Sequence, residues 1–202
     1  PKNFNLLKKL FTKEFPKMKR LFVAVPVQLS PEFQSLTQKI QEGLSRDQIV
    51  WVKPELQHLT LRFLGATPDS KIDSLKKILS DITSNTPTFD LELDKIGVFG
   101  SKYAPTTIWY GFNEFSLFKN LFEKVEPQLQ ELGFVPNYGN FVPHLTVGRI
   151  KKIENKKRFT ELITTLQPMF SQKIPVTHLH LIRSKLNTSG PTYTTIGTYR
   201  LK

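Results

Sequence analysis

Hydrophobic positions along the chain follow two periods, one typical of strands and one typical of helices. Alternation of apolar and polar residues, or a short continuous apolar run, predicts a β-strand. Apolar residues three and four apart, opened by Ser or Pro and ended by Gly or Pro, predict a helix. The expected strands cover residues 21–25, 49–52, 57–64, 89–94, 106–112, 141–150, 174–184 and 193–201. The expected helices cover residues 31–41, 68–82, 115–132 and 158–166.

The order of these elements indicates the fold class. Strands and helices mix without a regular βαβ repeat and without a glycine-rich phosphate loop. We therefore expect an α+β fold with antiparallel sheets rather than a doubly wound nucleotide-binding fold. Residues 18–202 are expected to form a single domain, with residues 1–17 as an N-terminal extension. Apolar residues at helical spacing in residues 6–11 predict a short amphipathic helix docked on the protein, or else an arm that touches a membrane.

The composition narrows the classes of partner and chemistry. Lys and Arg number 29 against 17 Asp and Glu, for a net charge of +12. Such a surplus favours RNA, DNA or an anionic membrane surface, although a lysine-rich surface without such a partner fits it equally well. No apolar run reaches the roughly 18 residues of a transmembrane helix, and no membrane partner is expected. The chain has no cysteine, which excludes disulfides, a thiolate nucleophile and a cysteine-based zinc site. A monomer in the reducing cytoplasm is expected.

One short pattern occurs twice. His58-Leu59-Thr60-Leu61 and His144-Leu145-Thr146-Val147 share the order His, apolar, Thr, apolar. Each lies in an expected strand that follows a helix of its own. The simplest geometric account is a duplicated unit, in which two lobes contribute one such strand each.

The repeated pattern suits acid–base chemistry at phosphorus. Alternate side chains of a strand share a face, so His58 projects with Thr60, and His144 with Thr146. An imidazole, with an ordinary pKa of about 6.5, gives or takes a proton near neutrality. One histidine can take a proton from attacking water while the other protonates the leaving oxygen. The hydroxyls can bind the non-bridging phosphate oxygens. A zinc site is the competing interpretation, weakened by the lack of nearby carboxylates at ligand spacing.

Four other residues are candidates near this chemistry. His178 and His180 share a strand face but lack the threonine pattern, so we interpret them as structural or rim residues. Alternation places Arg62 on the same face as His58, as a second phosphate ligand or as a surface or lobe-bridging arginine. Phe63 falls on the core face by alternation, yet it is also a candidate for stacking on a terminal base.

The wider sequence around the repeat is similar to a known family. The segments that carry the similarity are residues 20–25, 58–65, 97–99, 108–111, 141–149, 184–186 and 190–193. In these segments the chain resembles the two-histidine (2H) phosphoesterase superfamily. Within it, the chain resembles the RNA 2′,3′-cyclic phosphodiesterases of the LigT and ThpR type, once named 2′-5′ RNA ligases. The resemblance extends from Arg20 to Leu201, and the motif Pro-His-x-Thr-x-x-Arg at residues 143–149 is specific.

The resemblance implies a fold, a reaction and a set of roles. It implies a bilobal, pseudo-symmetric fold with two antiparallel sheets around a cleft and helices outside. It implies hydrolysis of a terminal 2′,3′-cyclic phosphate of RNA, tRNA fragments included, to a 2′-phosphate without metal or cofactor. Reversal of this reaction would join RNA ends through a 2′-5′ linkage. By the resemblance His58 is the general acid and His144 the general base, while Thr60, Thr146 and Arg149 hold the phosphate.

The position of Arg149 conflicts with simple alternation. Arg149 follows His144 by five residues, which puts the two side chains on opposite faces of a regular strand. We therefore expect the strand to end or bulge near Gly148, or Arg149 to reach the phosphate from the edge.

Other functions remain open from the sequence. A phosphoesterase of the same fold that acts on 2′-5′ oligonucleotides or small cyclic nucleotides is one alternative. A non-catalytic RNA-binding protein is another, and it would leave the paired histidines without a purpose. An ATP-dependent ligase is disfavoured because no lysine lies in a recognisable nucleotidylation or phosphate-loop setting.

Overall fold

The computed structural model describes residues 17–202 except 138 and 189, so the helix expected within residues 6–11 lies outside the described residues. The strands are β1 (Met18–Pro26), β2 (Gln48–Trp51), β3 (His58–Pro68), β4 (Phe89–Leu93), β5 (Lys95–Ser101), β6 (Ala104–Gly111), β7 (His144–Lys152), β8 (Gln172–Val176), β9 (His178–Asn187) and β10 (Gly190–Arg200). The α-helices are α2 (Pro31–Gly43), α3 (Ile72–Ser84), α4 (Ser116–Glu131) and α5 (Lys156–Thr165). The short 3-10 helices η1 (Pro54–Leu56) and η2 (Asp69–Lys71) precede β3 and α3.

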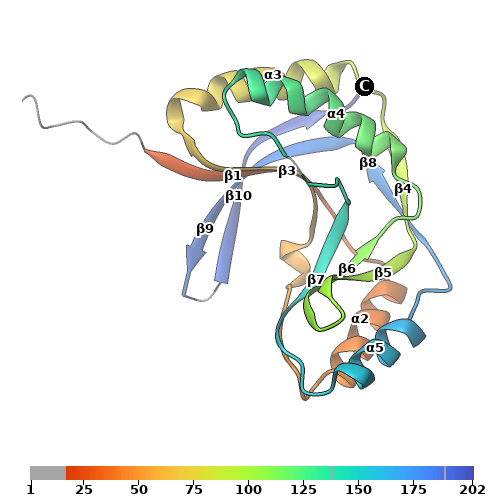
Figure 1. Cartoon of the computed structure of the whole chain (residues 1–202). Helices are drawn as coiled ribbons and strands as arrows, with labels where there is room; N and C mark the ends of the chain where they lie inside the picture. The colour runs from red at the N-terminus through yellow and green to blue at the C-terminus, as the bar shows by residue number, and fades with distance from the viewer. Residues whose placement is uncertain (1–16, 138, 189) are drawn as a thin grey trace, which may run out of the picture.

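The strands form one large antiparallel sheet and one small ribbon. The large sheet runs in the order β10-β9-β1-β3-β7-β6-β5, with β2 beside β7, while β4 pairs with β8. A single residue pair, Leu59 with Leu145, joins β3 to β7. We call β10, β9, β1 and β3 the His58 half, and β7, β6, β5 and β2 the His144 half (Figure 1). The expected α+β fold with two antiparallel sheets is confirmed, and these sheets are the two halves of one strand order.

Helices lie on the outside of both halves. Helices α3 and α4 pack together over the His58 half, and α2 with α5 over the His144 half (Figure 1). The Phe33 ring of α2 meets the Tyr110 ring of β6 edge-on at 4.9 Å. The chain passes from β1 to α2 and from β6 to α4, so each half is covered by a helix that follows a strand of the other half. Among the described residues, none of the helices is long and apolar enough to cross a membrane.

Both faces of β1 are buried, which explains its nearly continuous apolar sequence. Leu21 and Val23 are fully buried in the main core beneath the helices. Phe22 and Ala24, on the other face of β1, form a smaller cluster with Ile182 of β9. Burial of each large side chain contributes about 1.5–3 kcal/mol. The central strand of the His58 half is therefore a rigid base for side chains on the face of Phe22.

Two parts of the fold differ from the sequence prediction. The expected strand 174–184 is two strands, which divide at Thr177 because β8 pairs with β4 whereas β9 pairs with β1. Strand β5 was not predicted, since Gly97 and Gly100 weaken its strand pattern. A Cβ at Gly97 would collide with the indole of Trp109, so the glycine lets this ring lie flat across β5.

Candidate active site

The two repeated motifs meet where the halves of the sheet join. His58 is the first residue of β3 and His144 the first of β7. Leu59 and Leu145 pair across the junction and point into the core, with 0% and 1% of their surface exposed. The antiparallel register centred on this pair aligns each histidine with the threonine of the other motif. Both histidines and both threonines are half-buried and lie on the face opposite the leucines.

Each histidine is held by the same backbone contact. His58 Nδ1 lies 2.8 Å from the carbonyl oxygen of Leu56, and His144 Nδ1 lies 2.8 Å from that of Val142. A carbonyl oxygen only accepts hydrogen bonds, so Nδ1 carries the hydrogen in both rings. The Nε2 atom of each ring is then the one that takes or gives a proton. The arrangement leaves two equivalent nitrogen atoms for acid–base work.

Aromatic rings enclose each imidazole. The centroid of His58 lies 4.8 Å from that of Phe22 and 5.3 Å from that of Tyr193, which it meets edge-on. The centroid of His144 lies 4.6 Å from that of Phe99 and 6.3 Å from that of Trp109. These rings remove water from the imidazoles, which penalises the charged form.

The surroundings favour neutral imidazoles. Burial lowers the pKa of His58, and the charges of Arg149 and His144 lower it further, against the hydrogen bond to Leu56. Burial also lowers the pKa of His144, with Arg149 acting in the same direction against the hydrogen bond to Val142. His144 contributes to the lowered pKa of His58, so the charge of one ring disfavours the charged form of the other. Because both pKa values are lowered, the state with one protonated and one neutral ring, which an acid–base couple needs, forms at a pH below the ordinary histidine pKa of about 6.5.

A β-bulge brings Arg149 to the face of His144. In the pairing of β6 with β7, Trp109 is opposite Thr146 but Ile108 is opposite Gly148, so Val147 is an extra residue. Thr107 then pairs with Arg149. Since Thr107 and Trp109 share a face of β6, Arg149 shares the face of Thr146. The expected bulge near Gly148 is therefore present, and its extra residue is Val147, one residue earlier.

The same irregularity in β3 overturns the expected position of Arg62. Ala24 pairs with Thr60 but Val23 pairs with Arg62, which leaves Leu61 as an extra residue. Arg62 consequently lies on the face of Val23, opposite to that of Thr60 and His58.

The Arg62 side chain is engaged on that face. Its Nε donates to Glu126 of α4 at 2.6 Å, and its terminal nitrogens donate to the carbonyl oxygens of Phe63 and Val135. Arg62 thus ties β3 to α4 and the loop after it. The expectation that it shares the His58 face was wrong, because alternation does not continue through the bulge.

The bulge has the reverse effect on Phe63. Phe63 pairs with Phe22, so it lies on the face of His58, and its ring is 5.6 Å from that of Phe22. Its surface is 52% exposed, which contradicts the core position that alternation gave. An exposed ring beside the face of His58 is the geometry that stacking on a base requires.

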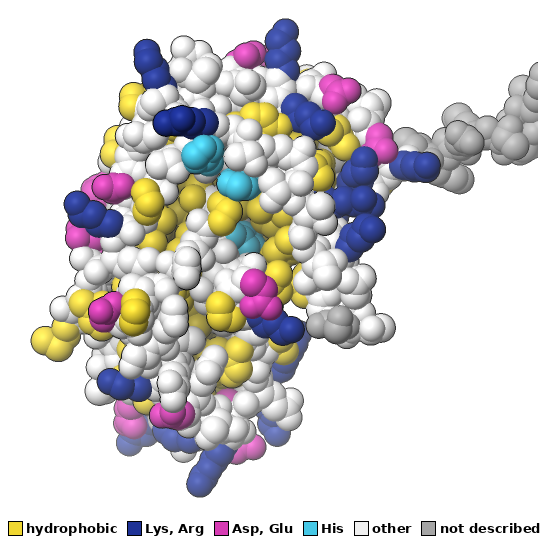
Figure 2. Space-filling model, turned by 180° about the vertical axis from the view of Figure 1, so that it is seen from behind, with side chains coloured by type: hydrophobic (Ala, Val, Ile, Leu, Met, Phe, Trp, Pro, Cys, Tyr) yellow, Lys and Arg dark blue, Asp and Glu magenta, His cyan; other side chains and the backbone are white. Residues whose placement is uncertain are grey.

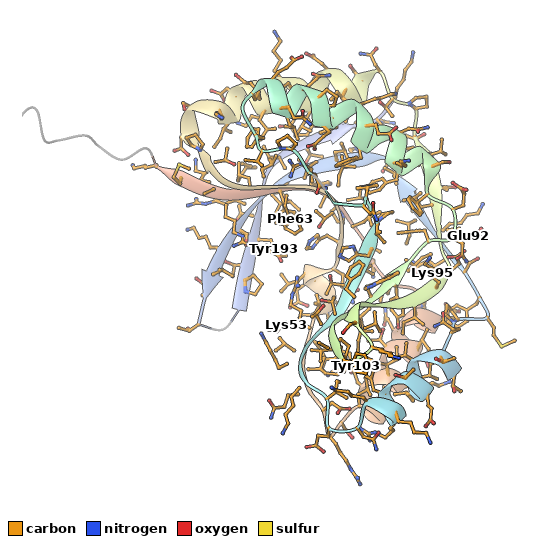
Figure 3. All side chains as sticks on the ribbon, viewed as in Figure 1. Lys53, Phe63, Glu92, Lys95, Tyr103 and Tyr193 are labelled. Atoms are coloured by element: carbon orange, nitrogen blue, oxygen red, sulfur yellow. The ribbon has the colours of Figure 1, made fainter. Side chains whose placement is uncertain are left out.

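Tyr193 is a neighbour of this face that the sequence did not single out. Its ring meets Phe22 edge-on at 5.1 Å and His58 at 5.3 Å. The ring of Phe63 also lies against Phe22, so Tyr193 of β10 and Phe63 of β3 border the same ring (Figure 3). The spacing of residues in the sequence could not reveal that Tyr193 contacts Phe22 and His58. These contacts depend on the order of strands β10, β9, β1 and β3 in the sheet.

His178 and His180 lie on β9, where the pairing of Ala24 with His180 places them on the face of Thr60. Nδ1 of His178 is 3.0 Å from the hydroxyl of Thr177. In Figure 2 the visible histidines lie near one another and are bordered by hydrophobic side chains. Among the described residues no three His, Asp or Glu side chains gather as metal ligands would.

Comparisons with known proteins agree with this geometry. The profile of the LigT-like phosphoesterases matches residues 23–110 and 114–193. An RNA 2′,3′-cyclic phosphodiesterase of Methanothermobacter thermautotrophicus is 32% identical over 90% of this chain and 98% of the relative. Its counterpart in Methanocaldococcus jannaschii is 33% identical over 88% of this chain and 98% of the relative. The chain therefore belongs to the LigT-like phosphoesterase family.

Solved structures share the fold. A protein of Thermus thermophilus, TT0787, superposes with a TM-score of 0.74 at 25% identity, over 90% of this chain and 97% of that one. Escherichia coli LigT, in a complex with 3′-AMP, superposes with a TM-score of 0.70 at 23% identity, over 92% and 99%. The bilobal arrangement is thus common to proteins that share about a quarter of their residues.

Proposed function

We propose that this protein hydrolyses the 2′,3′-cyclic phosphate at the 3′ end of RNA. The observation that carries the proposal is the matched pair of histidines, each held at Nδ1 and each presenting Nε2 on one face. The names of the relatives support the choice of RNA 2′,3′-cyclic phosphodiester as substrate. One chain supplies both histidines, so a monomer suffices for the chemistry.

The proposed reaction is a single displacement at phosphorus. His144 Nε2 takes a proton from water as the water oxygen bonds to phosphorus. The bond from phosphorus to the 3′ oxygen breaks, and His58 Nε2–H gives its proton to that oxygen. The products are a 2′-phosphate and a 3′-hydroxyl. His144 then loses its proton to solvent and His58 gains one, which restores the starting protonation states.

The other residues hold the reacting group. The hydroxyls of Thr60 and Thr146 donate to the non-bridging oxygens, where negative charge builds in the transition state. Arg149, on the same face, adds a positive charge beside them. The exposed ring of Phe63 stacks on the terminal base. These assignments place the phosphate over the junction and the base over the His58 half.

The test is identification of the product. A short RNA that ends in a 2′,3′-cyclic phosphate is incubated with the full chain in heavy-oxygen water. We expect a phosphate that contains one heavy oxygen and whose phosphorus NMR signal shows coupling to the 2′ hydrogen. The rate of hydrolysis should be the same with and without a chelator. A 3′-phosphate product would mean that the 2′ oxygen, and not the 3′ oxygen, is the leaving group. Failure of hydrolysis with intact RNA binding would favour a non-catalytic RNA-binding protein, and dependence on metal would favour the zinc interpretation.

A further inference from the structure

The face that carries His58 continues along the His58 half beyond the histidines. Arg20 of β1 pairs with Ala66 of β3 and with Ser184 of β9, and Ser184 pairs with Tyr193 of β10. Cross-strand partners point to the same face of a sheet, and Arg20 is two residues from Phe22. This row of four residues therefore lies on the same face as Phe22, Phe63 and His58.

The charges of two arginines act on the phenol of Tyr193. Burial raises the pKa of Tyr193, while the positive charges of Arg149 and Arg20 act on the phenol in the opposite direction. Arg149 comes from β7 of the His144 half and Arg20 from β1 of the His58 half, so charges from both halves act on the phenol. Arg20 is separated from Tyr193 by one intervening strand, about 10 Å of backbone that both long side chains can cover.

Neither Arg20 nor Arg149 forms an ion pair with the residues that the structure describes. A 2′,3′-cyclic phosphate carries a single negative charge, and the proposed function assigns it to Arg149. Arg20 is exposed on the same face without an anion of its own among the residues that the structure describes.

Successive rows of this face follow the order of groups in an RNA strand. Along β1 the rows are Ala24 with Thr60, then Phe22 with Phe63, then Arg20 with Ala66. The rows thus offer a phosphate ligand, an aromatic ring and a second cation in turn. The end of an RNA chain presents a phosphate, a nucleoside and the next phosphate in the same order.

We propose that Arg20 and the hydroxyl of Tyr193 form a second phosphate site, which binds the phosphodiester on the 5′ side of the terminal nucleoside. The inference rests on the proposed function, and it adds that the substrate is an RNA chain rather than a mononucleotide. A cyclic mononucleotide leaves this second site without an anion.

A neutral linkage tests the second site directly. The substrate is the dinucleotide UpU that ends in a 2′,3′-cyclic phosphate, compared with the same molecule whose internal linkage is an uncharged methylphosphonate. A hydrogen-bonded charge pair is worth about 1.5–3 kcal/mol, so kcat/KM of the unaltered protein should fall about 10- to 100-fold with the neutral linkage. In Arg20→Gln the two substrates should differ by less than about threefold, because the interaction partner is already lost.

Arg183→Gln is the matched control. Arg183 lies beside Ser184 on β9, but it pairs with Leu21 and therefore points to the opposite face. Figure 2 shows Lys and Arg side chains gathered where β1 begins, so general attraction of RNA has to be measured separately. Arg183→Gln removes the same charge, and it should keep the full difference between the two substrates.

Two results would overturn the second phosphate site. One is an unaltered protein that turns over both dinucleotides equally. The other is a difference between the two substrates that persists in Arg20→Gln or disappears in Arg183→Gln. Calorimetric binding of UpU carrying a 2′-phosphate, with either linkage, gives a readout without turnover. Linkage-dependent binding that needs Arg20, in a protein that hydrolyses nothing, would refute the proposed function and retain the second site.

Discussion

Strands β3 and β7 begin alike and end differently. Both open with His-Leu-Thr, both tie the histidine Nδ1 to the carbonyl two residues earlier, and both bulge three residues after the histidine. The fifth residue after the histidine then lies again on the face of the histidine in each strand. In β3 this residue is Phe63, and in β7 it is Arg149. The shared part is suited to proton transfer. The part that differs orients the proposed substrate, with the base at Phe63 and the phosphate at Arg149.

The residues on the opposite face differ in the same systematic way. The fourth residue after the histidine is Arg62 in β3, where it binds Glu126, and Gly148 in β7. A Cβ at Gly148 would lie 2.8 Å from side-chain atoms of Ile49 and Trp51, so glycine lets β2 pack there. The repeat therefore retains the proton-transfer geometry while each half meets different neighbours.

Loss of either histidine should have the largest effect. We expect His58→Ala and His144→Ala each to lower kcat on cyclic-phosphate RNA by a factor of about 10² or more. Because the two act as a unit, the double variant should lose far less than the product of the single losses. His178→Ala is the matched control and should retain activity, with circular dichroism as the check of folding. Full activity in either single variant would show that the repeat is structural.

Arg149→Gln should have the next largest effect, a fall in kcat/KM of about 10- to 100-fold from one lost charged hydrogen bond. It should also move the pH profile. In the unaltered protein both histidine pKa values are lowered, so the bell-shaped profile of kcat/KM should peak below about pH 6.5. Removal of a positive charge raises both pKa values, and the peak should move to higher pH. A profile that stays in place would mean that Arg149 does not act on the imidazoles.

Phe63→Leu should affect binding more than chemistry. Stacking on an aromatic ring is worth about 1–3 kcal/mol per base, so KM should rise about 5- to 100-fold while kcat changes little. Phe170→Leu, another exposed ring that lies on the outer side near Phe33, is the control. An equal loss in kcat alone would indicate that Phe63 positions His58 through Phe22 rather than the base.

Arg62→Met should have the smallest effect on activity and act on stability instead. It removes the charged partner of Glu126, a side chain only 10% exposed that keeps its hydrogen bonds from Asn137 and Gln130. The free energy of unfolding should fall by about 1.5–3 kcal/mol. Lys76→Met breaks the exposed pair with Asp73 and should cost less than about 0.5 kcal/mol in the same urea titration. A drop of more than twofold in kcat of the folded Arg62→Met protein would indicate that Arg62 takes part in the reaction.

The sequence predicted most elements and the position of the repeat, because periodicity records which side chains are buried. Periodicity did not reveal the bulge at Leu61, because Leu61 is apolar whether the strand is regular or not. The bulge near Gly148 was expected only because the family resemblance placed Arg149 at the phosphate. Alternation therefore gave the wrong face for Arg62 and for Phe63. Tyr193 was out of reach for another reason: its neighbours are set by the strand order, which local patterns do not encode.

The pairing of β1 with β9 has a consequence for how the protein is made. It joins residues 20–24 to residues 180–184, so the strand that supports His58 through Phe22 gains its other neighbour only when nearly the whole described chain has been synthesised. Contacts between such distant segments slow folding, because closing the long intervening loop costs entropy before the contacts form. During translation the His58 half stays incomplete until β9 and β10 emerge. Competence to open a phosphodiester should therefore arise abruptly, at the end of folding.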